Sequence, residues 1–541
     1  MSSALQDAIK KGLLRDGVTS YSNVEPVQAA RQILVNSYVF PYVGELPIWT
    51  NGGIQWTVQF ENNAASKNLW FYSLVFIDYL VKAAVLEADD IYWEKAIELY
   101  RSYKKWREQD KNSKSLLFRD EHAVTNRACV FSQLLHCVLN RATDNEDLIL
   151  LVQDIVDELI EHGDWLALDE HYVFNNHGIM MDRALLNLVV QFRSYNSERF
   201  SEKNDLWLNK SLERLNMMLH RVFDKDGCCT ENSPSYHMLN MSLFGAIDSF
   251  IRNNNLSIEK NEINVVLKQV IEASSYMFHE DGTLPLVGDS EERPSVFVPD
   301  GFYKDKFGFG FFPDAGFCFV KEPGFYLTFK CGGTSFSHRH IDDTSITLRI
   351  DGLDFICDGG MYSYDYNDPI RKFLMSSRGH SGFFTEQNSA TLFSNYSSAK
   401  EMARMLDVKI FSPFLQLEGE SQIDKQALIN RKITALKNEN AKYTALLIDD
   451  SFDSTVEKGW RIQFLLHPDV NLIVENDKAI LNRGNVALLV SFNTTEKYKL
   501  VIEDGYFSKK YQMVDKCKVL VAIGSSMSAN ISTLISVRYL D

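Results

Sequence analysis

The 541-residue chain lacks the cysteine spacing that would indicate a disulfide framework or a compact zinc-binding module. Its eight cysteines are scattered among apolar neighbours at positions 129, 137, 228, 229, 318, 331, 357 and 517, and none forms a CxxC pair. In a chain of this length such cysteines are typical of free, buried thiols.

Long apolar runs are also lacking. No stretch of about 18 uninterrupted apolar residues occurs, so no transmembrane helix is predicted. The first residues, MSSALQDAIKKGLLRDG, contain no apolar core of the signal-peptide type. We therefore expect a cytoplasmic protein with no membrane partner, with export by another route left open.

A basic surplus is missing as well, because the formal net charge is −16. Neutralising phosphates needs a basic surface, so a general nucleic-acid partner is excluded. The same charge argues against attracting an anionic polymer by the overall field of the protein. If the substrate is acidic, local cations must attract it.

The chain is long enough for two or three domains, and its pattern changes near residue 300. Before that point apolar residues recur at spacings of three and four, which predicts amphipathic helices. The predicted helices are 69–84, 92–106, 123–140, 145–162, 180–193, 206–222, 238–252 and 263–278. Their similar lengths and short polar connections favour paired helices wound into a toroid.

After about residue 312, short runs of alternating apolar and polar residues lie between Gly, Asn and Asp turns, which is typical of an antiparallel sandwich. Examples are GFCFVKE, FYLTFKCGG, SITLRIDG, TALLIDDSF, WRIQFLLHP and KVLVAIG. We therefore predict a multidomain α+β protein, with an (α/α) toroid over residues 1–300 and an antiparallel β-sandwich over residues 301–541.

Two segments of the helical half carry polar side chains near predicted helix starts. Residues 175–178, NNHG, precede the helix expected from Met180, where they can cap the helix or project into a cleft. In residues 231–237, ENSPSYH, a proline turn leads into a helix whose first turn carries Tyr236 and His237. A tyrosine can transfer a proton if nearby positive charge lowers its pKa from about 10. Structural roles remain open for both segments.

The strongest pattern is HRHID at residues 338–342, where a strand is expected to begin. Period-two alternation would place its two histidines and its last aspartate on one face. Asp358 and His380 follow in later segments. Two histidines and one carboxylate are donors that zinc accepts, so His340 with these two residues forms a candidate zinc set. Because the set is spread over three segments, spacing alone leaves structural roles open.

Taken together, the segments resemble the heparinase II/III-like polysaccharide lyases. The matching pieces, in the order of the family, are NNHG (175–178), E-x-S-P-x-Y-H (231–237), GDS (288–290), HxHxD (338–342), DGGMYSY (358–364) and the segment around His380. Two departures stand out. The usual Ala-His-Asn-Thr is Gly-His-Ser-Gly at 379–382, and Arg339 replaces a small residue between the paired histidines.

The resemblance implies a toroid followed by a sandwich, and β-elimination from a uronic acid unit of an acidic polysaccharide. In that reaction a base removes the C5 proton and the 4-linked oxygen departs. Asn176 would donate to the substrate carboxylate, His177 and His338 would donate or shuttle protons, and Tyr236 would protonate the leaving oxygen. The resemblance also implies a structural zinc ion on His340, Asp358 and His380, and no organic cofactor.

Further substrate contacts are predicted near the motifs, from Asn175, Glu231, His237, Arg339 and Arg371; Asn175 is also expected to hold its loop. Two alternatives stay open: a uronyl C5-epimerase on the same scaffold, or a non-catalytic glycan-binding protein of a capsule or exopolysaccharide pathway. The polymer, whether glycosaminoglycan, alginate or capsule, and a homodimeric state are also left open.

Overall fold

The structure, a computed structural model, consists of two compact units, each described here by itself. It describes residues 25–40, 43–50, 53–61, 64–109, 120–141, 145–193, 198–256, 262–293, 306–386 and 402–540. Unit 1 contains the described residues up to 218 together with those of 246–261, and unit 2 contains those of 219–245 and 262–541. The change from helices to strands lies between residues 277 and 308, around the predicted residue 300.

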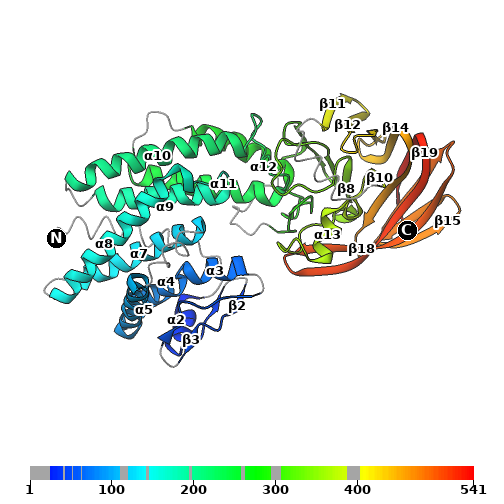
Figure 1. The fold of residues 1–541 in the computed structure, drawn as a ribbon. Coiled ribbons are helices and arrows are strands. Elements are labelled where there is room, and N and C mark those ends of the chain that lie inside the picture. The colour runs from blue at the N-terminus through cyan, green and yellow to red at the C-terminus, as the bar shows by residue number, and fades with distance from the viewer. Residues whose placement is uncertain are drawn as a thin grey trace. The chain divides into compact units, whose positions relative to one another are not determined.

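The N-terminal part of the chain is helical, as the apolar spacing predicts (Figure 1). Its helices are α2 Pro26–Leu34, α3 Ala64–Tyr72, α4 Val75–Leu86, α5 Asp90–Gln109, α7 Glu121–Arg141, α8 Glu146–Ala167, α9 Asn176–Arg193, α10 Glu198–Val222, α11 Pro234–Asn253 and α12 Ile263–Met277, with a 3-10 turn at Asp169–His171. The helix predicted over 69–84 is instead two helices, because Leu74 adopts the left-handed conformation (φ 56°) between α3 and α4.

Helix α7 is the central packing element of unit 1, where it contacts α4, α8 and α9. Val124, Ala128, Phe131 and Leu135 follow one another at helical spacing and are all buried. Burying a side chain of the size of Leu or Phe contributes about 1.5–3 kcal/mol. The heptad-like spacing of this sequence therefore accounts for both the helix and its position in the core.

One helical stretch, Ala64–Leu86, is long and apolar enough to cross a membrane by composition, with a mean hydropathy of 1.7. However, 78% of its most apolar window is buried inside the protein. These side chains therefore contribute to the core of unit 1.

Unit 2 contains a large antiparallel sheet. Its strands are β5 Gly308–Phe312, β6 Phe317–Glu322, β7 Phe325–Lys330, β8 Ser345–Ile350, β9 Leu353–Cys357, β10 Phe383–Thr385, β11 Ala403–Phe411, β12 Phe414–Ser421, β13 Ala427–Lys437, β14 Tyr443–Leu466, β15 Asn471–Glu475, β16 Lys478–Arg483, β17 Val486–Thr494, β18 Tyr498–Lys510 and β19 Met513–Tyr539. The main order is β15-β16-β17-β19-β14-β9-β8-β7-β6-β5. The short helix α13 Pro369–Met375 and a 3-10 turn at Ser377–Gly379 lie between β9 and β10. Unit 1 contains two small hairpins. One pairs β1 Val39–Phe40 with β2 Gly44–Glu45, and the other pairs β3 Trp49–Thr50 with β4 Gly53–Ile54.

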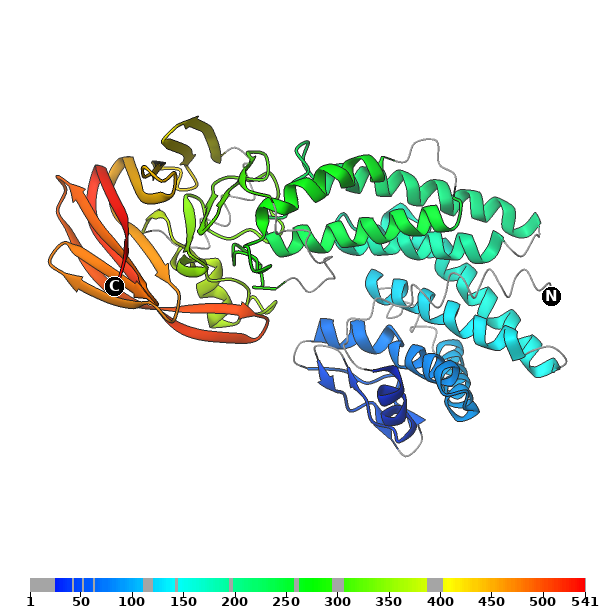
Figure 2. The same cartoon turned by 180° about the vertical axis from the view of Figure 1, so that it is seen from behind.

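The sheet folds into two layers because its longest strands change partners. The first half of β14 pairs with β13, whereas its second half pairs with β10 and β9. Figure 2 shows the long strands β14 and β19, in orange and red, running side by side. Strands that share no hydrogen bonds also meet face to face, since a Cβ on Gly419 of β12 would lie 2.9 Å from the Phe329 ring of β7. The predicted fold class, helices followed by an antiparallel sandwich, is confirmed.

The expectation of a strand at residues 338–342 is wrong. Residues 331–344 form an irregular connection from β7 to β8, and β8 begins only at Ser345. Within this connection His338 has a left-handed backbone (φ 55°), far from the β region in which non-glycine strand residues lie. Period-two alternation therefore does not place the two histidines, and tertiary contacts do so instead.

Candidate functional site

Tyr236 lies in the first turn of α11, and the residues before it explain its position. Pro234 begins the helix, where its missing N–H costs no hydrogen bond. The Oγ of Ser233 accepts a hydrogen bond from the Tyr236 N–H at 3.3 Å, as an N-cap does. Ser290 Oγ lies 2.9 Å from Ser233 Oγ and accepts from the Ser235 N–H at 3.3 Å. The helix start is therefore tied to the GDS segment of the sequence.

The imidazole of His338 stacks on the phenol ring of Tyr236, with ring centroids 3.5 Å apart and planes inclined by 24°. His338 comes from the β7–β8 connection, which Asn232 holds against the start of α11. The Asn232 amide donates to the carbonyls of Ser335 at 2.9 Å and Ser337 at 3.0 Å. Segments about one hundred residues apart in sequence thus bring a phenol and an imidazole together.

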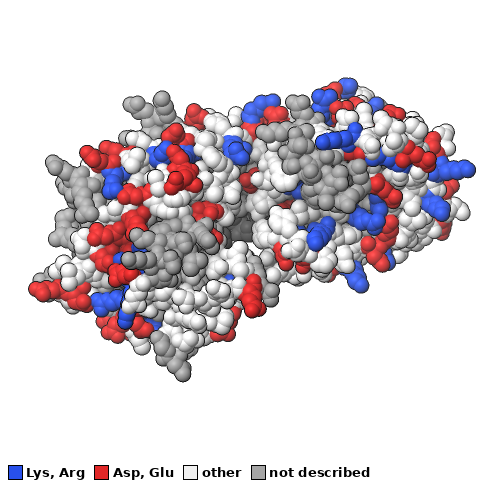
Figure 3. Space-filling view, viewed as in Figure 1, with Lys and Arg blue, Asp and Glu red and all other residues white. Residues whose placement is uncertain are grey.

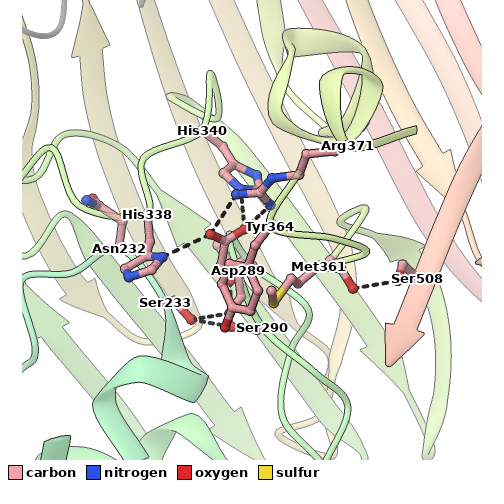
Figure 4. Close-up of polar contacts among 12 residues, drawn as sticks. Asn232, Ser233, Asp289, Ser290, His338, His340, Met361, Tyr364, Arg371 and Ser508 are labelled. Carbon is pink, nitrogen blue, oxygen red and sulfur yellow. Dashed lines mark hydrogen bonds and ion pairs between the residues drawn. The ribbon is translucent and has the colours of Figure 1, made fainter. Parts of the chain in front are cut away.

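Asp289 is a buried carboxylate that links three other site residues (Figure 4). Its Oδ2 accepts from His338 Nδ1 at 3.0 Å, and its Oδ1 accepts from His340 Nε2 at 2.8 Å. The guanidinium of Arg371 donates to both oxygens, to Oδ2 at 2.8 Å. Burial alone would raise the pKa of Asp289, but His340, His338 and Arg371 hold the pKa well below its ordinary value. The carboxylate therefore stays ionised and only accepts hydrogen bonds.

The ionised Asp289 sets the tautomers of both histidines. Because it has no proton to donate, Nδ1 of His338 and Nε2 of His340 must carry the protons in these two hydrogen bonds. In the neutral imidazoles the lone pair then lies on Nε2 of His338 and on Nδ1 of His340. The His338 side chain is 22% exposed and that of His340 is fully buried. The ring of His338 is therefore partly accessible, whereas that of His340 lies in the interior.

The glycine of the GDS segment is required by a close backbone approach. Gly288 has φ +60°, and a Cβ at this position would lie 2.3 Å from the carbonyl oxygen of Asn232. Any other residue would therefore displace Asp289 from the histidines. Sequence reasoning noted the GDS segment and assigned it no role.

Tyr364 is a second tyrosine at the site, and sequence reasoning did not single it out. Its hydroxyl lies 2.9 Å from the hydroxyl of Tyr236, and Tyr364 is 54% exposed. Burial, followed by Tyr364 and Asp289, raises the pKa of Tyr236 well above its ordinary value. This differs from the expectation that positive charge lowers the pKa, because burial and then the neighbouring phenol and carboxylate all raise it. Tyr236 is consequently a protonated phenol at neutral pH.

His340, Asp358 and His380 form a buried group whose ligand atoms lie within 4.8 Å of one another, as the candidate zinc set requires. His380 Nδ1 bonds to Asp358 Oδ2 at 2.8 Å, so in the neutral ring the lone pair lies on Nε2. This Nε2 and Nδ1 of His340 are both buried without a hydrogen-bond partner. Such orphaned nitrogens, each on a ring oriented by a carboxylate, fit a metal site. The donor set is therefore suitable for a zinc ion.

The NNHG segment lies in unit 1, at the beginning of α9. The helix starts at Asn176, four residues before the predicted Met180, because Asn175 caps it. The Asn175 Oδ1 accepts from the His177 N–H at 2.8 Å, so Asn175 does hold the loop. A Cβ on Gly178 would lie 2.1 Å from the Val173 carbonyl oxygen, which explains the glycine. Asn176 and His177 are therefore presented from a rigid first turn.

Two predicted substrate contacts in the ENSPSYH segment have partners inside unit 2 instead. Glu231 accepts from Asn240 Nδ2 at 3.1 Å. His237 is fully buried, where its Nδ1 accepts from the Cys229 N–H at 3.1 Å and its Nε2 lies 3.2 Å from the Val270 carbonyl oxygen. These two side chains hold the start of α11, and they are not open to a polymer.

The two predicted arginine contacts are also buried. Arg339 donates to Asp343 at 2.8 Å and to the Gly332 carbonyl, so it braces the β7–β8 connection. Arg371 is only 1% exposed, and its two terminal guanidinium nitrogens donate to Asp289. Both arginines therefore support the structure around the motifs, which differs from the predicted contact with substrate.

Charges of both signs are interspersed on each unit. On the face shown in Figure 3, Lys and Arg side chains alternate with Asp and Glu, and the described residues of that face form no continuous basic surface. This matches the net charge of −16. Attraction of an anionic substrate thus depends on individual groups at the site.

Comparison with solved structures identifies the fold. A heparinase III structure has a TM-score of 0.79 and 15% sequence identity, with 99% of this chain and 89% of that chain covered. A heparan sulfate lyase variant from Pedobacter heparinus has a TM-score of 0.74 and 15% identity, with 99% and 88% covered. Another heparinase III structure has a TM-score of 0.72 and 14% identity, with 95% and 84% covered. The chain therefore has the heparinase III fold.

A family model agrees with the fold. Residues 305–534 match the model described as "Heparinase II/III-like, C-terminal". The match to this region confirms the predicted resemblance to the heparinase II/III-like family. No curated protein matches the chain.

Proposed function

We propose that this protein is a polysaccharide lyase that cleaves an acidic, uronic-acid-containing polysaccharide or oligosaccharide by β-elimination. The observation that carries the proposal is the stacked pair of Tyr236 and His338, with Asp289 holding the proton of His338 on Nδ1. β-Elimination needs one group that accepts the C5 proton and one that donates a proton to the departing oxygen. An imidazole whose Nε2 is unprotonated, beside a protonated phenol, supplies both.

The two proton-transfer roles follow from the protonation states. His338 presents a lone pair on Nε2 and is partly exposed, so it is the proposed base. Tyr236 keeps its proton because its pKa is raised, so it is the proposed acid for the leaving oxygen. The hydroxyl of Tyr364 bonds to that of Tyr236 and is half-exposed, so it is the proposed route by which Tyr236 recovers a proton from water.

The C5 proton is weakly acidic, and its removal places charge on the neighbouring carboxylate. Donors that neutralise this carboxylate lower the barrier because they act where charge develops. Asn176 and His177, which begin α9, are the proposed donors. An amide and an imidazole suit this task, since elimination needs no hydrolytic nucleophile.

A panel of uronate polymers, monitored by ultraviolet absorbance, tests the proposal. The similar structures are a heparinase III and a heparan sulfate lyase, so heparan-type glycosaminoglycans are the first substrates to test. Hyaluronan-like, alginate and capsular polymers complete the panel. We expect absorbance to rise with at least one of them, because elimination leaves an unsaturated sugar.

Two other outcomes would contradict a lyase. Exchange of solvent deuterium into C5 without a rise in absorbance would indicate an epimerase, which returns the proton to the sugar. Binding of a polymer with neither exchange nor absorbance would indicate a glycan-binding protein.

We further propose that His340, Asp358 and His380 hold a structural zinc ion. A metal here would brace the β7–β8 connection that carries His338 and His340, and it would supply no step of the elimination. Removal by a chelator is expected to lower the melting temperature, while the protein that remains folded keeps its turnover number. Calorimetry and initial rates measured on the same samples check this, with zinc re-addition as the control. Rapid loss of turnover with an unchanged melting temperature would contradict it.

A further inference from the structure

Glu121 of α7 contacts His177 within unit 1. The Glu121 Oε1 lies 2.8 Å from His177 Nδ1, with side-chain exposures of 22% and 31%. Fifty-six residues separate the two in sequence, and neither the motifs nor their spacing indicates the pair. The ring of His122 also lies next to His177, with the two ring centroids 4.6 Å apart.

Both partners are held in place by caps at the starts of their helices. Asp120 precedes α7, and its Oδ1 accepts from the N–H groups of His122 and Ala123 at 3.0 Å. Asn175 caps α9 and accepts from the N–H of His177 itself. A first helical turn with its cap satisfied has little freedom, so the carboxylate and the imidazole meet in a fixed geometry.

Glu121 is ionised in this geometry. The hydrogen bond from His177 lowers the pKa of Glu121, against the opposing effect of partial burial. An ionised carboxylate only accepts, so the proton of the shared bond resides on Nδ1 of His177. The lone pair of the neutral ring is then on Nε2, the nitrogen on the opposite side of the imidazole.

We propose that Glu121 is a positioning residue that orients His177 and holds a proton on Nδ1, so that Nε2 is the nitrogen left to act on the substrate. This inference rests on the proposed function, in which His177 acts on the uronate. It gives the helical unit the same carboxylate–imidazole arrangement that Asp289 and His338 form in unit 2. When Nε2 takes up a proton from water, the imidazolium can donate a hydrogen bond to the uronate carboxylate while keeping that proton, and the negative charge of Glu121 stabilises the imidazolium.

Nitrogen-15 NMR of histidine-labelled protein tests the tautomer directly, without substrate. Spectra are taken near pH 9, where free imidazoles are neutral, and the His177 signals are assigned from their loss in His177→Gln. In the parent protein we expect Nδ1 protonated and Nε2 bare. In Glu121→Gln the amide can donate to Nδ1, so a mixture containing protonated Nε2 is expected. An identical tautomer in both proteins would overturn the proposal.

Kinetics provide the second readout. Glu121→Gln is expected to lower kcat by roughly 10- to 100-fold with KM changed less than kcat, as loss of an orienting partner typically does. Glu121→Asp keeps an acceptor and is expected to recover part of kcat. The control Glu262→Gln removes the carboxylate from the exposed His220–Glu262 pair, whose atoms are 2.5 Å apart, and should leave kcat unchanged.

The results that would contradict the role of Glu121 differ from the result that would contradict the proposed function. A changed tautomer with an unchanged kcat would overturn the role of Glu121 in the reaction. If the parent protein eliminated no uronate polymer, the proposed function would fail, and the NMR result would still decide whether Glu121 sets the tautomer of His177. A lower melting temperature with neither a tautomer change nor a kcat change would reduce Glu121 to a structural residue and overturn the proposal.

Discussion

Tyr236→Phe is expected to lower kcat by about 10²- to 10⁴-fold, the usual contribution of a positioned acid–base group. The substitution removes the phenolic proton that the leaving oxygen would take and keeps the ring that stacks on His338. KM and the melting temperature should therefore change little. Initial rates by ultraviolet absorbance, together with thermal unfolding of the same preparation, measure both effects.

Two further tyrosines serve as comparisons for this variant. Tyr364→Phe removes the hydroxyl partner of Tyr236 and leaves the proton donor in place, so we expect a smaller fall in kcat. Tyr539→Phe changes a half-exposed tyrosine on β19 and should have no effect. If Tyr236→Phe kept the turnover of the parent, Tyr236 could not be the acid, and the proposed mechanism would be wrong.

Asp289→Asn is expected to be the most damaging single change for the site, because it acts on both stability and chemistry. The asparagine removes the charge that pairs with buried Arg371 and leaves the guanidinium uncompensated, at a cost of about 3–5 kcal/mol in the free energy of unfolding. It also frees the proton of His338 to occupy either nitrogen. A loss of kcat in the protein that remains folded should accompany the loss of stability.

A second buried ion pair of unit 2 separates these effects. Asp450 binds Arg431 through two hydrogen bonds of 2.6 and 2.8 Å, and both side chains are fully buried, as Asp289 and Arg371 are. In the described part of the chain, Asp450 has no hydrogen bond to His338 or His340, the two histidines that Asp289 binds. Asp450→Asn should therefore destabilise the fold to a similar extent while the folded fraction keeps its kcat. Equal losses of kcat in both variants would show that Asp289 acts only through stability.

Much of the architecture could be predicted from the sequence. Helix α7 was predictable because Val124, Ala128, Phe131 and Leu135 repeat at helical spacing, and that spacing directly expresses which face is buried. The alternation of the predicted run TALLIDDSF likewise follows the burial pattern of β14, where buried and half-buried residues alternate from Leu446 to Phe452. Local caps were harder to predict. Helix α9 begins four residues before the predicted start, because the His177 N–H donates a hydrogen bond to the Asn175 side chain.

The candidate site was only partly predictable. The ordered motifs named Tyr236, His338 and the His340–Asp358–His380 group, and the structure brings each set together. The alternation argument for the two histidines was wrong, because their common feature is a shared bond to Asp289 from an irregular connection. Glu231, His237, Arg339 and Arg371 were predicted to touch substrate because they lie near motifs, although each has an internal partner. Proximity along the chain cannot separate a supporting residue from a contacting one.

The sequence alone predicted the helical and sheet halves, the family that the chain resembles and the types of side chain at the candidate site, because periodicity and short motifs are local properties. Protonation states and partners required the folded chain. A phenol that keeps its proton, an imidazole with its lone pair on Nε2 and a carboxylate that stays ionised all depend on burial and on neighbours far away in sequence. The electrostatic environment of a side chain depends on how the chain packs in three dimensions, so the spacing of residues in the sequence does not predict it.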